Sequence, residues 1–450
     1  MKSVGAAFLM RLATFPVTAA ATLLTTALVI HYTGSMAYGA IMLVANLFQL
    51  IPFADLGLGA VVINAVAQPD TTAEHRHRII AGVVHHLAVV GAIVAAVAFS
   101  GTLLFSWSGV LGIDASIPYV DISTAVALAL YGLAVPLGIG QRILIGLGKN
   151  HLAIAVSAGT SVVTLAVTLL MIGLQAPAAI LSIAVPAGIL ATSIVGFAVG
   201  RKLVHLRWRT LLQRSGVAAS TLARTAAPML VIMIGLPIAL HSGRLFLAWM
   251  ASPQELSEFT LAMQLYTPLW SFVTAAGMSL WPIFARANSD QEASRSLFRR
   301  SLAFFLAAGV FGSAMLALVG PWLGSLISQD KITLTPTLMI AVAAVLLVQT
   351  VQQVPGMFLT SAEGLKFQAV CVVVYCAAVV AGTWLLTPVL GPAGPPVVLA
   401  FSVLTFQLLP GLIRVSRTIR LRTREGTALP RPLPHEFPMP NEQEIPLKLS

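Results

Sequence analysis

The stretch GRKLVHLRWRTLLQRSGVAASTLAR, from Gly200 to Arg224, lies near the middle of the chain and decides how the rest is organised. It is rich in Lys and Arg and contains no Asp or Glu. Long apolar runs flank it, and each flank divides into about six runs of membrane-spanning length. Lys and Arg translocate poorly, so a basic segment between apolar runs belongs on the cytosolic side of a membrane. The stretch therefore predicts two six-helix halves joined inside the cell by a basic linker.

The composition excludes a protein that is solvated mainly by water. Apolar residues make up 58% of the 450 residues and charged residues only 9%, against about 25% charged residues in ordinary globular domains. The mean hydropathy is +0.91. The net charge of +11 does not indicate nucleic-acid binding, because the basic residues sit in short loops and form no continuous stripe with interleaved aromatic residues.

The apolar runs predict an all-α integral membrane protein with about twelve transmembrane helices in two parallel six-helix bundles around a central cleft. The second and eighth runs are long enough to be tilted or broken. The predicted spans are 9–31, 37–66, 79–105, 120–146, 151–173, 178–200, 224–250, 257–284, 301–327, 336–360, 367–389 and 394–414. The predicted regions are an N-terminal bundle (1–200), a basic cytosolic linker (201–223), a C-terminal bundle (224–414) and a disordered cytosolic tail (415–450).

The charge distribution supports this topology. With both termini in the cytosol, all but two of the 26 Lys and Arg residues fall at or inside the cytosolic boundary; the exceptions are Arg244 and Lys331. An odd number of missed or false spans would scramble this segregation. The distribution predicts a multi-pass membrane protein with cytosolic termini.

A faint internal repeat relates the two halves. RLATFPV at Arg11 resembles RTAAPML at Arg224, and YGAIMLVANLF at Tyr38 resembles FTLAMQLYTPLW at Phe259. ILIGLGKNHLA, which begins at Ile143, also resembles FLTSAEGLKFQA further along the chain. Six spans is an even number, so the halves would share one orientation, as in several transporter architectures. Chance similarity among apolar helices is the other explanation.

Three stretches resemble a known family. YGAIMLVANLFQLIPFADLGLGAVVIN (Tyr38 to Asn64) resembles the second helix of bacterial polysaccharide exporters, and GQRILIGLGKNHLA at Gly140 and LWPIFARA at Leu280 resemble their fourth- and eighth-helix endings. With twelve predicted spans, the chain resembles an oligosaccharide flippase of the Wzx or polysaccharide-transporter type, in the multidrug/oligosaccharidyl-lipid/polysaccharide exporter superfamily.

Basic residues at matching helix ends are candidates for phosphate binding. Arg11 and Arg224 begin the first helix of each half, and Arg142 and Lys366 lie at the equivalent ends of the fourth and tenth helices. A guanidinium offers a donor fork that suits phosphate oxygens. The alternative for all four is ordinary positive-inside anchoring with snorkelling side chains.

Charge inside a span is costly and usually faces a cavity. Arg244 breaks the charge rule, and we expect it either to pair with Glu255 or Glu258 or to line the pathway beside His241. Trp270 is either an interfacial anchor or a platform for a sugar ring.

Asp55, with Gly57 and Gly59 behind it, either holds a helix break and binds a coupling cation or caps the second helix. Asp55 and His241 make H⁺ or Na⁺ the candidate coupling cation. We predict no resident cofactor and no metal site.

The chain contains no phosphate-binding P-loop and no hydrolase motif, so we predict a non-enzyme. The resemblance implies a transporter that flips polyprenyl-diphosphate-linked oligosaccharide by alternating access, for O-antigen or other surface polysaccharide. Membrane lipid and a glycan polymerase or glycosyltransferases would be its partners. Three alternatives are a cation-coupled multidrug exporter of the same superfamily, a lipid II flippase, although that group usually has more spans, and a non-transporting scaffold of a glycan-assembly complex.

Overall fold

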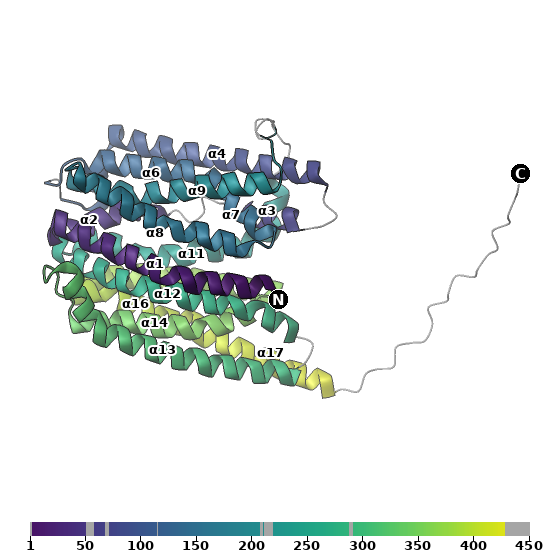
Figure 1. Cartoon of the computed structure of the whole chain (residues 1–450). Helices are drawn as coiled ribbons and strands as arrows, with labels where there is room; N and C mark the ends of the chain where they lie inside the picture. Colours follow the sequence, from purple (N-terminus) through teal and green to yellow (C-terminus); the bar gives the residue numbers. More distant parts are fainter. Residues whose placement is uncertain are drawn as a thin grey trace, which may run out of the picture.

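The computed structural model describes residues 2–50, 58–67, 72–114, 116–207, 210, 219–287 and 291–427. Every regular element in these ranges is a helix. Figure 1 shows two layers of long helices, with the first half of the chain mainly above and the second half below. The predicted all-α architecture is confirmed.

The first half begins with α1 (Lys2–Thr33) and continues into a second span that is interrupted, as predicted. Helix α2 (Ser35–Ala45) ends at Asn46, a 3-10 turn follows, and the next described helix starts at Leu58. The Asn46 side-chain amide donates to the Met42 carbonyl at 2.8 Å, which helps to end α2. The other elements of this half are η1 (Leu47–Leu50), α3 (Leu58–Ala67), α4 (Ala73–Leu104), α5 (Trp107–Leu111), α6 (Val120–Leu137), α7 (Ile139–Gly146), α8 (Asn150–Gly173), η3 (Ala178–Ile183) and α9 (Ala184–Leu203).

The second half starts with α11 (Ala219–Met250), inside the segment predicted as linker. Its second span is not broken, because α12 (Pro253–Ala287) is one continuous helix. The remaining elements are α13 (Gln291–Ser328), α14 (Pro336–Phe358), α15 (Ala362–Leu390), η4 (Gly391–Ala393), α16 (Gly394–Val403), the π-helical turn η5 (Leu404–Leu408) and α17 (Leu409–Thr427).

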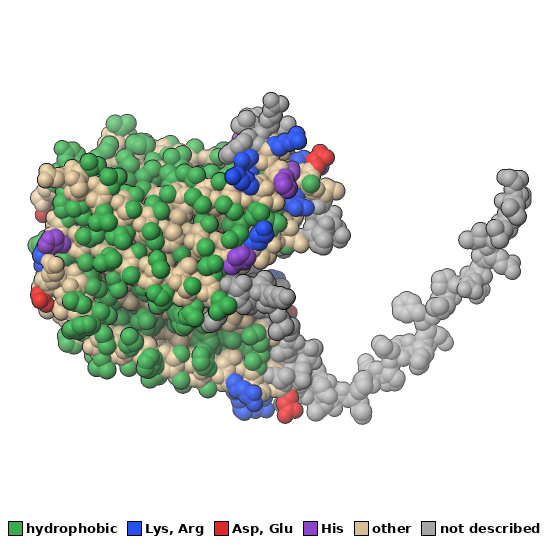
Figure 2. Space-filling view, in the orientation of Figure 1, with side chains coloured by type: hydrophobic (Ala, Val, Ile, Leu, Met, Phe, Trp, Pro, Cys, Tyr) green, Lys and Arg blue, Asp and Glu red, His purple; other side chains and the backbone are tan. Residues whose placement is uncertain are grey.

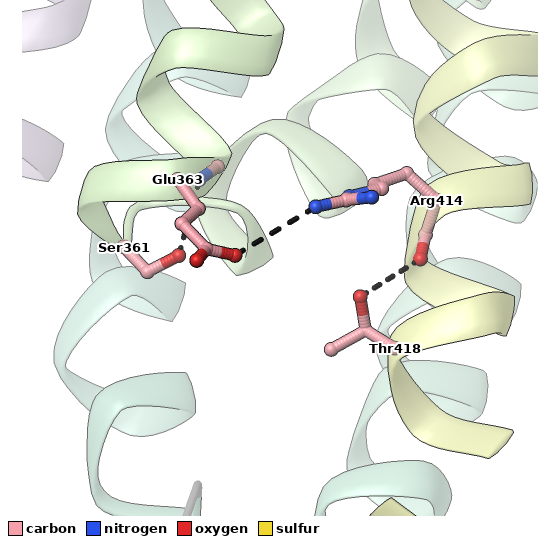
Figure 3. A network of polar contacts seen from close by, with 5 residues as sticks. Ser361, Glu363, Arg414 and Thr418 are labelled. Atoms are coloured by element: carbon pink, nitrogen blue, oxygen red, sulfur yellow. Dashed lines mark hydrogen bonds and ion pairs between the residues drawn. The ribbon is translucent and has the colours of Figure 1, made fainter. Parts of the chain in front are cut away.

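Helix α17 corrects the prediction of a disordered tail from residue 415. Val415 is fully buried in an apolar cluster with Phe358, and Ile419 packs against the same cluster. The Arg414 guanidinium lies 3.8 Å from the Glu363 carboxylate at the start of α15 (Figure 3). This tertiary packing involves the first part of α17, whose helix continues as far as Thr427, and residues 428–450 lie outside the described part of the chain.

The surface is that of a multi-pass membrane protein. Eight stretches of the described helices are long and apolar enough to cross a bilayer. Large apolar side chains project outward along them, including Leu103 at 86% exposure and Leu318 at 80%. Figure 2 shows these side chains covering the middle of the molecule, while most of the visible Lys and Arg residues gather at one end. We call this the basic end; α4 starts there with Arg76 and Arg78. We call the opposite end of the molecule the far end; it carries Asp114, Glu255 and the 330–331 turn.

Packing divides the helices into the two expected bundles. In the first, α6 packs between α4 and α9, and α8 packs between α1 and α9. In the second, α14 packs between α12 and α13, and α15 packs between α11 and α16. The bundles meet chiefly where α2 crosses α12, with further contacts from α1 to α12 and α13. This arrangement leaves a cleft between the halves.

Candidate functional site

A cavity of about 360 Å³ lies between the two bundles. We call it the central cavity. Its walls come from α1, α2, η1, α8 and α9 of the first half and from α11 and α12 of the second. On the visible face the molecule is hollowed between the halves at the basic end (Figure 2). The cavity is therefore the interior of the predicted central cleft.

The first-half wall of the central cavity is polar but uncharged. The α1 and α8 helices supply hydroxyl groups, and the Thr22 hydroxyl donates to Ser161 Oγ at 3.3 Å. The end of α2 supplies amides, with Gln49 Nε2 donating to Asn46 Oδ1 at 2.7 Å. These amides reach the cavity because α2 stops at Asn46 and the chain turns. The polar residues of this wall are Thr22, Thr25, Asn46, Gln49, Thr160, Ser161 and Thr164.

The second-half wall carries a cation. His241 and Arg244 lie three residues apart on α11, which places them on one helix face, and both line the cavity. Arg244 is only 7% exposed.

Among the residues that the structure describes, no carboxylate forms an ion pair with Arg244. Neither Glu255 nor Glu258, both of which belong to the described residues, forms an ion pair with it. The Glu255 carboxylate instead accepts hydrogen bonds from the Ser252 amide and hydroxyl at the start of α12, each at 2.8 Å. A buried guanidinium without a counter-ion is unfavourable unless polar groups or an anion compensate it. The cavity that Arg244 faces is where such an anion would bind.

Aromatic rings complete the second-half wall. The rings of Tyr266 and Trp270 are stacked, with centroids 6.1 Å apart and planes inclined by 15°. The Tyr266 hydroxyl donates to Gln349 Oε1 in α14, which fixes the orientation of the ring. Trp270, half-buried, lines the cavity one turn further along α12. An aromatic face beside hydroxyl and amide groups can bind sugar rings.

The structure thus brings together three of the residues singled out from the sequence, Arg244, His241 and Trp270. Lys366 is exposed near the start of α15, and Arg142 lies in α7; neither lines the central cavity.

The remaining candidates lie nearer the basic end or outside the described residues. Arg11 is half-buried in α1, and it precedes Thr22 by a helical rise of about 16 Å. Gly59 is buried in α3. Asp55, Gly57 and the side chain of Arg224 lie outside the part of the chain that the structure describes.

Sequence reasoning missed the amide side chains of the site, which come from both halves. Asn46 and Gln49 stand in an apolar run just before the predicted break, and Gln264 stands in the eighth apolar run. Arg244 was singled out because it is a charge within an apolar run. An amide within such a run is a similar but weaker signal, because a polar group in hydrocarbon also needs a partner. Applied to amides, the same rule would have found these three residues.

The fold has solved relatives. No protein-family model matches the sequence, and a comparison with curated proteins finds no match. An inward-facing multidrug resistance MATE-family transporter of the MOP superfamily is similar with a TM-score of 0.68 and 13% identity, over 92% of this chain and 99% of that one. The lipid II flippase MurJ in an inward closed conformation has a TM-score of 0.66 and 12% identity, over 93% of this chain and 91% of that one.

A third structure, a MOP-superfamily transporter from Pyrococcus furiosus, has a TM-score of 0.61 and 13% identity, over 93% of this chain and 96% of that one. At such low identity, these comparisons show a shared fold: this chain has the architecture of MOP-superfamily transporters. An outward-facing MATE-family structure is less similar, with a TM-score of 0.55.

Proposed function

We propose that this chain is an alternating-access transporter that moves a polyprenyl-diphosphate-linked oligosaccharide across the bacterial inner membrane for surface-polysaccharide synthesis. The observation that carries the proposal is Arg244, a buried guanidinium that pairs with no carboxylate of the described residues and lines a cavity with further polar side chains between the halves of a MOP-type fold.

The cavity chemistry fits each part of such a substrate. Moving phosphates and sugar hydroxyls through hydrocarbon without help is prohibitively costly. Arg244 offers a planar donor fork to a diphosphate oxygen. The hydroxyls and amides of the opposite wall exchange hydrogen bonds with sugar hydroxyls, and Trp270 offers a ring face. The lipid tail stays in the bilayer.

The other basic candidates have supporting roles in this proposal. Arg11 and Arg224 attract the diphosphate toward the cleft from the cytosolic side, while Arg142 and Lys366 anchor helix ends. His241 and Asp55 are the candidate groups for coupling to H⁺ or Na⁺. A glycan polymerase or glycosyltransferases would consume or supply the substrate.

The basic end is the cytosolic end in this proposal, because Lys and Arg translocate poorly. The two termini then lie in the cytosol. Reporter fusions at Gly112 and Thr210 test the orientation: we expect an outside signal at Gly112 and an inside signal at Thr210, and a reversed pair would contradict it.

A cation-coupled multidrug exporter of the same fold is the second candidate. The MATE-family likeness favours it. It would need an acidic group for cationic drugs, yet the described lining of the central cavity contains Arg244 and no Asp or Glu. A scaffold without transport activity would tolerate the loss of Arg244.

Reconstitution tests the proposal. The full chain is placed in liposomes with a short polyprenyl diphosphate that carries one fluorescent sugar, and translocation is read from protection of the probe against a membrane-impermeant quencher. We expect transport by the native chain, loss in Arg244→Ala, and native transport in Arg300→Ala, which removes an exposed arginine of α13. Equal rates in protein-free liposomes, or in Arg244→Ala, would refute the substrate assignment. Transport of a cationic dye instead would favour the exporter.

A further inference from the structure

A second cavity lies between the two halves, nearer the far end. Its volume is about 710 Å³, and the residues around it include Thr33, Asp114 and Ser252. We call it the far cavity.

The central and far cavities occupy successive stretches of the same helices. On α11, Arg244 lines the central cavity and Ala248 the far one; on α12, Met263 lines the central cavity and Leu256 the far one. The two cavities therefore follow one line through the molecule.

Helices α2 and α12 touch between these cavities. The backbone amide of Gly39 donates to Ser257 Oγ at 2.9 Å. A Cβ atom at Gly39 would lie 2.7 Å from the Ser257 nitrogen and 2.9 Å from the Leu256 carbonyl carbon. These are backbone atoms, so no side-chain rotation could relieve the contact. Tyr38 and Phe259 beside it are both buried. Only glycine permits the two helices to approach this closely.

Three further hydrogen bonds join the halves at the far end. Trp249 Nε1 of α11 donates to the Val110 carbonyl at 2.8 Å, and Lys331 Nζ donates to the His31 carbonyl at 3.3 Å. His31 Nδ1 and Gln329 Oε1 are 3.0 Å apart. All of these contacts lie on the far side of the central cavity, whereas the cleft is hollowed at the basic end (Figure 2).

We propose that the contact of Gly39 with Leu256 and Ser257 is the far-side gate of the transport path, and that Trp249 reinforces it. This inference rests on the proposed transport function. A solute in the central cavity reaches the far cavity only when α2 separates from α12. An added methyl group at position 39 is overpacked only in the closed state, in which α2 and α12 are in contact. It therefore shifts the equilibrium toward the state that is open on the far side.

Site-directed labelling tests the gate without any substrate. In a chain with Cys371 and Cys376 replaced by Ala, Ser161→Cys places one thiol in the wall of the central cavity. A membrane-impermeant maleimide is added to the far face of sealed vesicles of known orientation. We expect Gly39→Ala to raise the labelling rate at position 161 about tenfold, the shift that an overpacking cost of ordinary size produces.

Gly173→Ala is the matched control, because a Cβ at Gly173 meets no atom within 4 Å; it leaves the rate unchanged. Trp249→Phe removes one donor without adding volume and gives a smaller rise, about two- to fivefold. Trp249→Phe also serves as the test of the gate if the Gly39→Ala variant fails to insert into the membrane.

Native labelling rates in both Gly39→Ala and Trp249→Phe would overturn the gate. Raised labelling rates in these variants, together with no translocation of the polyprenyl probe by the native chain, would support the gate and contradict the substrate assignment.

Discussion

The two walls of the central cavity differ in chemistry although they belong to bundles of the same design. The polar groups of the first-half wall are hydroxyls and amides only, whereas the second-half wall adds Arg244, His241 and two stacked rings to the amide and hydroxyl groups of α12. The faint repeat in the sequence suggested matched basic residues in each half. Within the described lining, the cation instead comes from one half only. A symmetric fold can thus hold a polar substrate asymmetrically, with its anionic group on one bundle and its hydroxyl groups on the other.

The largest expected effect concerns the charge of the second-half wall. Arg244→Gln should lower transport of the polyprenyl probe about a hundredfold, because it removes the charge that would pair with the bound diphosphate, and truncating one member of such a buried charge pair costs about 2–5 kcal/mol. Arg244→Lys should lose less, about tenfold, since it keeps the charge and loses the planar fork. The measurement is the initial rate in liposomes at low probe concentration. If Arg244→Lys and Arg244→Gln lower the transport rate equally, Arg244 acts through the geometry of its guanidinium and not through its charge.

The rings of the same wall should matter next. Trp270→Ala should weaken probe binding about three- to tenfold, the usual worth of an aromatic contact beyond its buried area. Trp270→Phe should recover most of this loss. The control is a polyprenyl diphosphate without sugar, for which Trp270→Ala should have no effect on binding. An equal loss with and without sugar would mean that Trp270 supports the wall and does not contact the glycan.

The uncharged wall should give smaller effects. Thr25→Val and Asn46→Ala should each reduce the transport rate about two- to fivefold, because a single neutral hydrogen bond contributes about 0.5–1.5 kcal/mol. The same sugar-free probe should be insensitive to Thr25→Val. Melting of the detergent-solubilised variants provides the control for folding. If Thr25→Val is as damaging as Arg244→Gln, the contrast between the walls is wrong.

The smallest effect is expected outside the cavity. Lys366→Ala removes an exposed cation at the start of α15, and we expect less than a twofold change in rate. Arg142→Ala tests the other matching position by the same assay. A large loss of transport with normal protein levels in either variant would indicate that the residue contacts the substrate.

Much of the architecture could be predicted from the sequence because lipid imposes strong rules. Apolar runs of spanning length predicted the helices, and the run from Tyr38 to Asn64 was expected to be tilted or broken; α2 ends within it. Arg244 stood out because a charge within a span is costly. The same approach failed for Asn46 and Gln49, since amides cost less than charges and periodicity does not reveal which face meets a cavity.

Tertiary packing explains the other differences from the sequence prediction. The segment after residue 415 reads as a solvated basic tail. Val415 nevertheless fills a space among Phe358 and its neighbours, which no local pattern records. The eighth run was long enough to break, but α12 spans it in one piece, because the helix is packed along α14 and against α2.

The π-helical turn η5 fixes the angular phase of everything that follows it. A π-turn is an α-helix with one inserted residue, and each residue of a helix advances the azimuth by about 100°. Deleting one residue between Leu404 and Leu408 would turn α17 by that angle. Arg414 would then swing away from Glu363, and Val415 would leave its apolar contacts. The orientation of the last helix is therefore set by a single extra residue upstream of it, and not by the arginines that it displays.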